Sequence, residues 1–356
     1  MQHNNLDFSN QTFFIGIDTH LNQWKVTIRS AGIELKTFSM HPSASELYNY
    51  LTKHYPKGNF NIVYEAGFSG FWPYRKLIES GINCIVVNPA DIPTSSKEKV
   101  NKSDPVDSRK LARELENGSL KALYMPDIYH EQLRSLMRLR FRTTQNQTRI
   151  KNRIKGLLRN YGITIPREHL TNPRWSGYFI HWLKSVKLDT DAGQFTLSNL
   201  IAQLEQSREH LKNILRQLRI EAKKENISPV IKAISSVPGI AFISAMSLYT
   251  EIIDIYRFKD FGNLCSFIGL VPSTYSSGEI EYDRGMSFRH NKFLRPLLIE
   301  AAWTAVRKDP ALTISFSELI KQMPRQRAII RIAKKLLRRI YHVWLYNENY
   351  VFSLVA

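Results

Sequence analysis

Two apolar runs in the first third of the chain each end in a carboxylate. Phe-Phe-Ile-Gly-Ile leads to Asp18, and Asn-Ile-Val-Tyr leads to Glu65. Short apolar runs of this kind predict buried strands. Asp104 and Asp107 follow, three residues apart at the start of a predicted helix, so both lie on one helix face. Two strand ends and one helix face can therefore bring four carboxylates together.

Four carboxylates in one place repel one another unless a cation lies between them. A ligand set made only of oxygen suits Mg²⁺ or Mn²⁺. The alternative is that these are solvated acids at the ends of strands and helices, where Asp and Glu are common. The order of the elements around the acids favours the metal site.

The first third of the chain predicts a regular order of elements. Alternating apolar and polar residues predict a meander of three strands, and Ser43 can cap the helix that follows. Ser103 and Pro105 suit the cap and first turn of the last helix in this part. The expected elements are strands at 13–18, 24–29 and 33–38, a helix at 43–54, a strand at 61–65, a helix around 72–78, a strand at 83–87 and a helix at 103–115.

This order resembles the ribonuclease H-like fold. The resemblance implies an α/β domain in which acids on the first strand, a middle strand and the last helix meet at one edge of the sheet. In that fold the acids hold two metal ions about 4 Å apart for in-line displacement at phosphorus. The positions of the acids and the expected fold therefore support each other.

Three local strings are more specific than the order of elements. They are Gly-Ile-Asp-Thr-His at Asp18, Tyr-Glu-Ala-Gly at Glu65, and Lys-Ser-Asp-Pro-Val-Asp-Ser-Arg-Lys-Leu-Ala across Asp104 and Asp107. Together they resemble the DEDD transposases of bacterial insertion sequences, the IS110 family, whose N-terminal domain is similar to the RuvC Holliday-junction resolvase. The resemblance implies that the four acids are catalytic and bind Mg²⁺ or Mn²⁺. His20 is not included, because a histidine two residues past a strand end is more often a surface residue.

The charge of the chain indicates a polyanionic partner. Its 50 Lys and Arg against 31 Asp and Glu give a formal net charge of +19 in 356 residues, which suits nucleic acid or an anionic membrane surface. No apolar run reaches membrane-spanning length and the N-terminus lacks a signal pattern, so we expect no membrane partner. Cys84 and Cys265 are expected to be buried free thiols in a reducing compartment. The expected protein binds nucleic acid in the cytoplasm.

Residues 134–159 contain nine basic residues and no acid. Apolar residues at helical spacing predict a helix with one apolar face, the rest being cationic or amide-bearing. A solvated helix face usually mixes Glu with Lys, so the one-sided charge favours contact with phosphate over a purely solvated face. The candidate nucleic-acid-binding residues of this stretch are Arg138, Arg142, Arg149, Lys151, Arg153 and Lys155.

A second long helix is expected at 197–224, where leucines recur at helical spacing. The aromatic loop before it, with Tyr178 and Phe179, is expected to pack against the helices rather than stack on bases. A slender arm of paired helices predicts a partner chain, so we expect a homo-oligomer, either a dimer or a tetramer. The expected division is a RuvC-like catalytic domain at 1–125, a helical coiled-coil arm at 126–228 and a mainly helical C-terminal transposase domain at 229–356.

The last third also resembles the IS110 family, in its C-terminal transposase domain. The strings that carry the resemblance lie at 261–272, at 276–278, where the sequence is Ser-Ser-Gly, and at 284–298. The resemblance implies a Ser-Gly loop whose serine is a nucleophile that joins covalently to DNA, by position Ser277, with Ser276 as the second candidate. A helical hairpin with a Pro-Gly turn precedes these strings, and the family commonly has glycine where this chain has His290. The expected phosphate ligands of this part are Arg289, Lys292 and Arg295.

The final helix, expected at 325–346, has two interpretations. Its apolar residues lie on one side, and cations such as Lys334 and Arg338 lie elsewhere around it. It is either a further nucleic-acid surface or an amphipathic core helix whose cations extend to solvent.

The resemblance implies an RNA-guided DNA recombinase or transposase of an insertion sequence. Members of the family use a structured bridge RNA that pairs with donor and target DNA, so base pairing carries specificity while the protein holds the backbones. The implied mechanism is attack by Ser277 on a phosphate, assisted by Mg²⁺ at the four acids. The alternatives are a RuvC-like junction nuclease that uses metal-activated water, or an inactive nucleic-acid-binding scaffold. The implied location is the bacterial cytoplasm, in association with the nucleoid.

Overall fold

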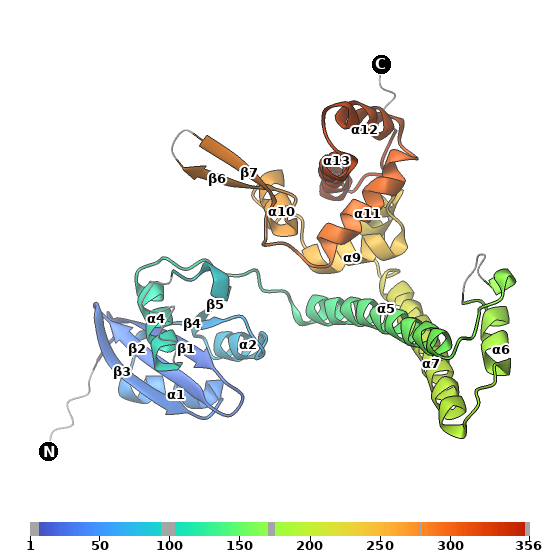
Figure 1. The fold of residues 1–356 in the computed structure, drawn as a ribbon. Helices are drawn as coiled ribbons and strands as arrows, with labels where there is room; N and C mark the ends of the chain where they lie inside the picture. Colours follow the sequence, from blue (N-terminus) through green and yellow to red (C-terminus); the bar gives the residue numbers. More distant parts are fainter. Residues whose placement is uncertain (1–6, 94–103, 170–174, 278–279, 353–356) are drawn as a thin grey trace. The chain divides into compact units, whose positions relative to one another are not determined.

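The structure, a computed structural model, describes residues 7–93, 104–169, 175–277 and 280–352 (Figure 1). Side chains are not described for 104–105, 273–277 and 280–284. The chain divides into two compact units, Met1–Met125 and Pro126–Ala356. The second unit contains both the expected arm and the expected C-terminal domain, and the further boundary at 229 stays a prediction.

A mixed sheet of five strands forms the centre of the described part of the first unit (Figure 1). The central strand β1 pairs antiparallel with β2 and parallel with β4. β3 pairs antiparallel with β2, and β5 pairs parallel with β4, which gives the order β3-β2-β1-β4-β5. The strands are β1 Thr12–Thr19, β2 Trp24–Ser30, β3 Ile33–Met40, β4 Asn59–Glu65 and β5 Asn83–Val87.

Helices pack on both faces of this sheet. Ile15 and Ile17 of β1 lie in one apolar cluster with residues of α1 (Ala44–His54) and α2 (Trp72–Glu79), so these helices cover one face. Val63 of β4 lies in a separate cluster with Leu111 of α4 (Asp104–Glu116), so α4 covers the other face. Alternation along each strand sends successive side chains to opposite faces, which explains the two clusters.

Gly16 allows α4 to approach the sheet closely. A Cβ atom at Gly16 would lie 2.2 Å from the carbonyl oxygen of Ser108 and 2.5 Å from the amide nitrogen of Ala112. The same region is fixed by a hydrogen bond of 2.9 Å between the buried hydroxyls of Thr27 and Ser108. A residue without a side chain in β1 therefore sets the distance between α4 and the strands beneath it.

The second unit begins with two long antiparallel helices, α5 (Ile128–Asn160) and α7 (Asp191–Glu221), shown in green in Figure 1. The hydroxyl of Tyr129 donates to Glu221 at one end of the pair, at 2.7 Å, and Gln147 donates to the carbonyl of Ser207 further along, at 3.0 Å. A short helix, α6 (Gly177–Ser185), lies between them in sequence. We call α5, α6 and α7 the helical arm.

The remaining chain is mainly helical and has its own apolar core. Its helices pack into one large cluster that also receives Leu133 and Met137 from α5. A two-stranded antiparallel hairpin, β6 (Pro272–Ser277) and β7 (Ile280–Met286), extends from this core. The helices are α8 Ser228–Ser236, α9 Phe242–Ile252, α10 Phe261–Ile268, α11 Leu294–Val306, α12 Pro310–Gln322 and α13 Arg325–Tyr346.

The α/β character of the first part and the helical character of the rest are confirmed. Ser43 caps α1 as expected, accepting a hydrogen bond of 3.2 Å from the amide of Glu46. Cys84 and Cys265 are buried free thiols, also as expected. In the described residues, no helix combines the length and apolarity needed to cross a membrane.

Two expectations about local structure were wrong. The aromatic segment taken as a loop contains helix α6, with Phe179 buried against the arm as expected and Tyr178 exposed. The serine segment taken as a loop forms the β6–β7 hairpin. Both segments are too short to carry a clear period, so their tertiary setting decides their structure.

Candidate metal and nucleic-acid sites

Asp18 and Glu65 lie side by side at the ends of adjacent parallel strands. Ile17 of β1 is paired with Tyr64 of β4, so the next residue on each strand is a carboxylate. Asp18 follows Gly16 by two residues, and Gly16 faces α4. Because side chains alternate along a strand, Asp18 and Glu65 both belong to the face that α4 covers.

Helix α4 runs so that its first turn comes to the same end of β1. Near its C-terminus, Glu116 accepts a hydrogen bond of 2.8 Å from Arg29, which pairs with Phe14. Earlier in the helix, Ser108 bonds Thr27, which pairs with Gly16. Moving toward the N-terminus of α4 therefore means moving toward the end of β1 that carries the first acid.

Asp107 lies in this first part of α4, next to the buried Ser108, and its side chain is partly exposed. Asp104 is the first residue of the helix, one turn before Asp107, and its side chain is outside the described part. Helix geometry places Asp104, Asp107 and Leu111 on one side of α4, and Leu111 packs against the sheet. The fold thus brings Asp18, Glu65 and Asp107 to one end of the sheet, on one face, and α4 begins at Asp104, one turn before Asp107.

The described carboxylates do not by themselves form a metal centre. Among the described side chains, no group of three or more His, Cys, Asp or Glu residues is close enough to hold a metal ion. The donor chemistry still fits a hard divalent cation, since carboxylate oxygens are the preferred ligands of Mg²⁺ and Mn²⁺. The structure supports a shared location for the acids at this end of the sheet.

His20 is a residue that the sequence analysis set aside. Its Nε2 atom lies 3.1 Å from Oδ2 of Asp18. The string Gly-Ile-Asp-Thr-His already contained the signal, because residues i and i+2 leaving a strand end can turn toward each other. The contact places His20 beside the candidate metal ligand, where it can orient that carboxylate.

The candidate nucleophile lies at the end of a strand. Ser277 is the last residue of β6 and is paired with Ile280 of β7, while Ser276 is paired with Glu281. The expected glycine neighbour, Gly278, is outside the described residues. Both serines therefore belong to the distal end of the β6–β7 hairpin, next to its turn.

The base of this hairpin is held by Arg295 of α11. Its Nη1 atom donates to the carbonyl of Ser287 at 2.7 Å, and the amide of Ser287 donates to Val271 at 3.1 Å. Burial lowers the pKa of the Arg295 guanidinium. This residue, expected as a phosphate ligand, therefore has a partner within the chain. The other two expected phosphate ligands, Arg289 and Lys292, have exposed side chains.

His290 packs against Gly269, the residue that ends α10. Gly269 has a φ of +87°, and a Cβ there would lie 2.3 Å from the Cβ of His290. Glycine satisfies both the left-handed backbone and the close approach. The histidine that replaces the family's common glycine is therefore accommodated by a glycine on the neighbouring segment.

The cations of α5 fall into two groups. Arg138 donates two hydrogen bonds to the buried Glu251, at 2.8 and 2.9 Å, and its guanidinium lies 4.9 Å from the ring centroid of Phe293. Arg138 thus has an internal partner. In contrast, the exposed cations of this helix among the candidates are Arg142, Arg149 and Arg153.

Lys151 and Lys155 lie over the ring of Trp175, with Nζ atoms 5.8 and 5.9 Å from its centroid. Burial lowers the pKa of Lys151, and the nearby charges of Arg208 and Lys155 lower it further. Two cations therefore share one aromatic ring, and Arg208 donates to the carbonyl of the same residue, an arrangement that an added anion would stabilise.

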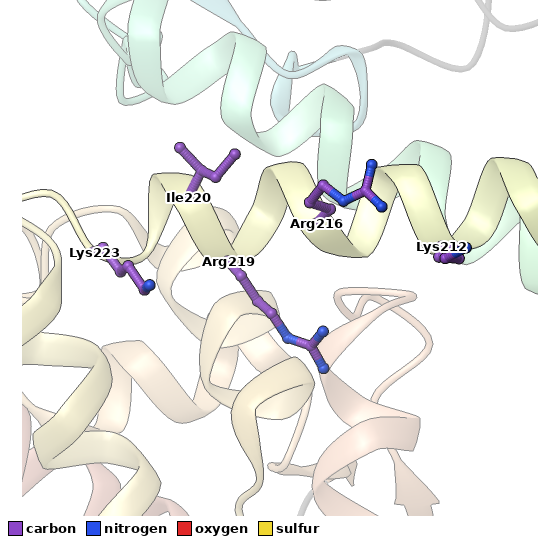
Figure 2. Close-up of a pocket in the computed structure, with 5 residues that line it drawn as sticks. All are labelled: Lys212, Arg216, Arg219, Ile220 and Lys223. Atoms are coloured by element: carbon purple, nitrogen blue, oxygen red, sulfur yellow. The ribbon is translucent and has the colours of Figure 1, made fainter.

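A cationic stripe on α7 was missed by the sequence analysis. Figure 2 shows it along the end of that helix. Spacings of four and three residues put the three cations on α7 along one side, and Lys223 lies two residues past the end of the helix. Together they surround a shallow hollow that also includes the exposed Ile220. The spacing of these cations is visible in the sequence, but the stronger leucine pattern of α7 indicates only its packing face. The stripe consists of Lys212, Arg216, Arg219 and Lys223.

Comparison with known families supports both parts of the chain. A family model described as "Transposase" matches residues 15–163, which include all four acids. A second, described as "Transposase IS116/IS110/IS902 family", matches residues 231–316, which include Ser277. Together the two matches span both units of the structure.

Among curated proteins, the chain is 29% identical over 241 residues to the putative transposase y4qE of Sinorhizobium fredii, covering 68% of this chain and 57% of that protein. It is 27% identical over 299 residues to the transposase for insertion sequence element IS1111A of Coxiella burnetii, covering 81% and 79%. It is 28% identical over 308 residues to the putative transposase y4rJ of Sinorhizobium fredii, covering 78% and 74%. The match to y4qE therefore spans little more than half of that protein's length.

Proposed function

Because this chain belongs to the IS110 family of transposases, we propose that it is an RNA-guided DNA recombinase that cuts and rejoins DNA through a serine nucleophile. The observation that carries the proposal is the convergence of acids at one end of the sheet, where Asp18 and Glu65 end adjacent strands and α4 brings Asp107. The strand order also supports a RuvC-like, ribonuclease H-like first domain.

The four acids are the proposed ligands of divalent metal ions. Bound Mg²⁺ or Mn²⁺ would polarise the scissile phosphate and stabilise the leaving oxygen. The contribution of the chain is to hold the ligands: Asp18 and Glu65 by the parallel pairing of β1 with β4, and Asp104 and Asp107 by the packing of α4. His20 would orient the carboxylate of Asp18 from the side.

Ser277 is the proposed nucleophile, with Ser276 as the second candidate. Its Oγ forms a bond to phosphorus, the bond from phosphorus to the 3′ oxygen breaks, and the serine proton is transferred so that a free 3′-hydroxyl leaves. A 3′-hydroxyl from the other DNA strand then attacks the phosphoserine and releases the serine. The two steps exchange one phosphodiester for another, so no external source of energy is needed.

Guide RNA and DNA are the proposed polyanionic partners. The net charge of +19 and the exposed cations of α5 and α7 support binding along phosphate backbones, which carries no sequence information by itself. Base pairing of the RNA with donor and target DNA would supply the specificity. The helical arm is the proposed oligomer contact.

Trapping of a covalent adduct tests the proposal. The full chain, loaded with the RNA that copurifies with it, is incubated with target DNA and Mg²⁺, denatured, and separated by gel electrophoresis. We expect a protein–DNA adduct from the unmodified protein, and none from Ser277→Ala or Asp18→Asn. DNA cleavage by the unmodified protein without any adduct would instead indicate hydrolysis by water, and normal cleavage by Ser277→Ala would overturn the serine assignment.

A further inference from the structure

Helix α13 has one face fixed in the core and another that carries only positive charge. Ile332, Ala333, Leu336 and Leu337 are buried in the large apolar cluster of the second unit. The helix, Arg325–Tyr346, contains no Asp or Glu. The interpretation as an amphipathic core helix is thus confirmed, because the apolar residues form a core face and the cations line the opposite side. The interpretation as a nucleic-acid surface stays a prediction. Those cations are Arg325, Arg327, Arg331, Lys334, Lys335, Arg338 and Arg339.

A shallow hollow of about 520 Å³ runs along this cationic face, between α13 and Phe261 of α10. The guanidinium of Arg338 lies 4.8 Å from the ring centroid of Phe261, which holds that cation against the wall of the hollow. The residues lining it include five cations and no acid, namely Arg331, Lys334, Lys335, Arg338 and Arg339.

The chain neutralises only part of this charge. Arg339 forms an ion pair of 3.0 Å with the buried Asp309, and Lys335 donates to the hydroxyl of Ser315. Arg331 and Lys334 are exposed and have no ion-pair partner within the described part of the chain. Like charges three and four residues apart on a helix repel each other, so binding of an anion would stabilise a face of this kind.

We infer that this hollow binds the phosphodiester backbone of a nucleic-acid strand. The inference depends on the proposed function in one respect, which is that the bound polyanion is a nucleic acid. From Arg331 to Arg338 the helix rises about 10 Å, which matches about three nucleotides of a strand with a rise of about 3.4 Å. Because the far side of α13 is buried, these side chains project from a fixed scaffold and bind without ordering the helix first.

The chemistry of the face disfavours a membrane as the occupant. A helix that lies on a membrane inserts an apolar face between the lipids. The apolar face of α13 is already buried by the core of its own unit. What remains accessible is cationic, with Phe261 only partly exposed and covered by Arg338. A flexible chain of phosphates fits such a face better than a bilayer does.

The test compares two triple variants of the full chain with the same loss of charge. The first is Arg331→Gln, Lys334→Gln and Lys335→Gln, in the hollow. The matched control is Lys53→Gln, Lys76→Gln and Lys321→Gln, at exposed positions scattered over three helices. Glutamine keeps helix propensity, and thermal unfolding checks that both variants stay folded. The probes are a fluorescent 30-base-pair DNA duplex of arbitrary sequence and a structured RNA hairpin, each titrated between about 50 and 200 mM salt.

We expect the hollow variant to flatten the salt dependence of binding by about two to three units for at least one probe, at roughly 0.9 per lost phosphate contact, and the control to change it little. The probe that responds identifies the backbone as DNA or RNA. Equal behaviour of the two variants with both probes would overturn the inference. Adduct formation is measured separately, so the binding result can be interpreted even if the serine mechanism fails. Normal adduct formation together with an unchanged salt slope in the hollow variant would reject this inference and leave the proposed function intact.

Discussion

Arg138 on α5 donates two hydrogen bonds, of 2.8 and 2.9 Å, to the carboxylate of Glu251 on α9. Glu251 is buried, and it also accepts a hydrogen bond of 3.0 Å from Asn291, just before α11. One carboxylate therefore ties the helical arm to two segments of the C-terminal core. A residue that the sequence marks as a phosphate ligand is, in the fold, part of the joint between the arm and the core.

This joint predicts different outcomes for two arginines on the same helix. Arg138→Ala should lower the free energy of unfolding by about 1–3 kcal/mol, because it leaves a buried carboxylate without its main donor. Arg142→Ala should leave stability unchanged but reduce the salt dependence of RNA binding by close to one unit. Chemical denaturation and binding titrations of both variants check this. The same loss of salt dependence in both would show that Arg138 also contacts phosphate.

The metal site predicts a link between ions and stability. Asp18→Asn and Glu65→Gln should each reduce strand cleavage by roughly a hundredfold or more, since the metal ions supply several kcal/mol of transition-state stabilisation. Mg²⁺ should raise the melting temperature of the unmodified protein and do so less in either variant, while nucleic-acid affinity stays close to normal. Near-normal cleavage by both variants in Mg²⁺ is the result that rejects the site.

Gly16 predicts a severe effect from a single methyl group. Gly16→Ala would place a Cβ 2.2 Å from the carbonyl of Ser108, so α4 has to move away from the sheet and the acids of its first turn move with it. We expect a destabilisation of about 1–3 kcal/mol together with a loss of cleavage. Gly67→Ala is the matched control, because its new Cβ would have only Glu65 O within 4 Å, at 3.9 Å. Equal behaviour of the two variants would mean that α4 is not held at this distance.

The proposed serine predicts complementation between chains. Serine is a poor nucleophile by itself and becomes useful only beside a base or a metal ion. The metal ligands lie in the first unit and Ser277 in the second, so we expect a composite active site, shared between subunits of an oligomer. Mixing Ser277→Ala with Asp107→Asn should then restore part of the recombination activity that each variant lacks. A mixture that stays inactive, although each variant assembles with unmodified protein, excludes a shared site.

Much of the first unit was predictable because its signals are local. The apolar runs before Asp18 and Glu65 specify buried strands, and parallel pairing then sets the two acids side by side. The direction of α4 follows from longer-range contacts, such as that of Arg29 with Glu116, which no short pattern contains. The sequence therefore predicts that the acids lie near one another. That Asp18, Glu65 and Asp107 lie on the same face of the sheet follows only from the contacts of the folded structure.

The second unit was less predictable because the charge of a side chain does not reveal whether it pairs with a carboxylate inside the fold or faces solvent. Arg138 and Arg142 are equivalent in the sequence, and only the buried Glu251, more than a hundred residues away, distinguishes them. The cations of α7 were hidden by a stronger apolar pattern on the same helix. The strands around Ser277 lack a pattern long enough to separate a hairpin from a loop.

The length of α5 gives the Arg138–Glu251 joint a mechanical role. The helix continues for 22 residues beyond Arg138, to Asn160, which corresponds to about 33 Å. A tilt of about 5° at the joint would therefore displace the far end by about 3 Å, the length of a hydrogen bond. The arm acts as a lever that pivots where α5 meets the core, at Leu133, Met137 and the Arg138–Glu251 pair, so small rearrangements around Glu251 become displacements large enough to make or break contacts at its tip.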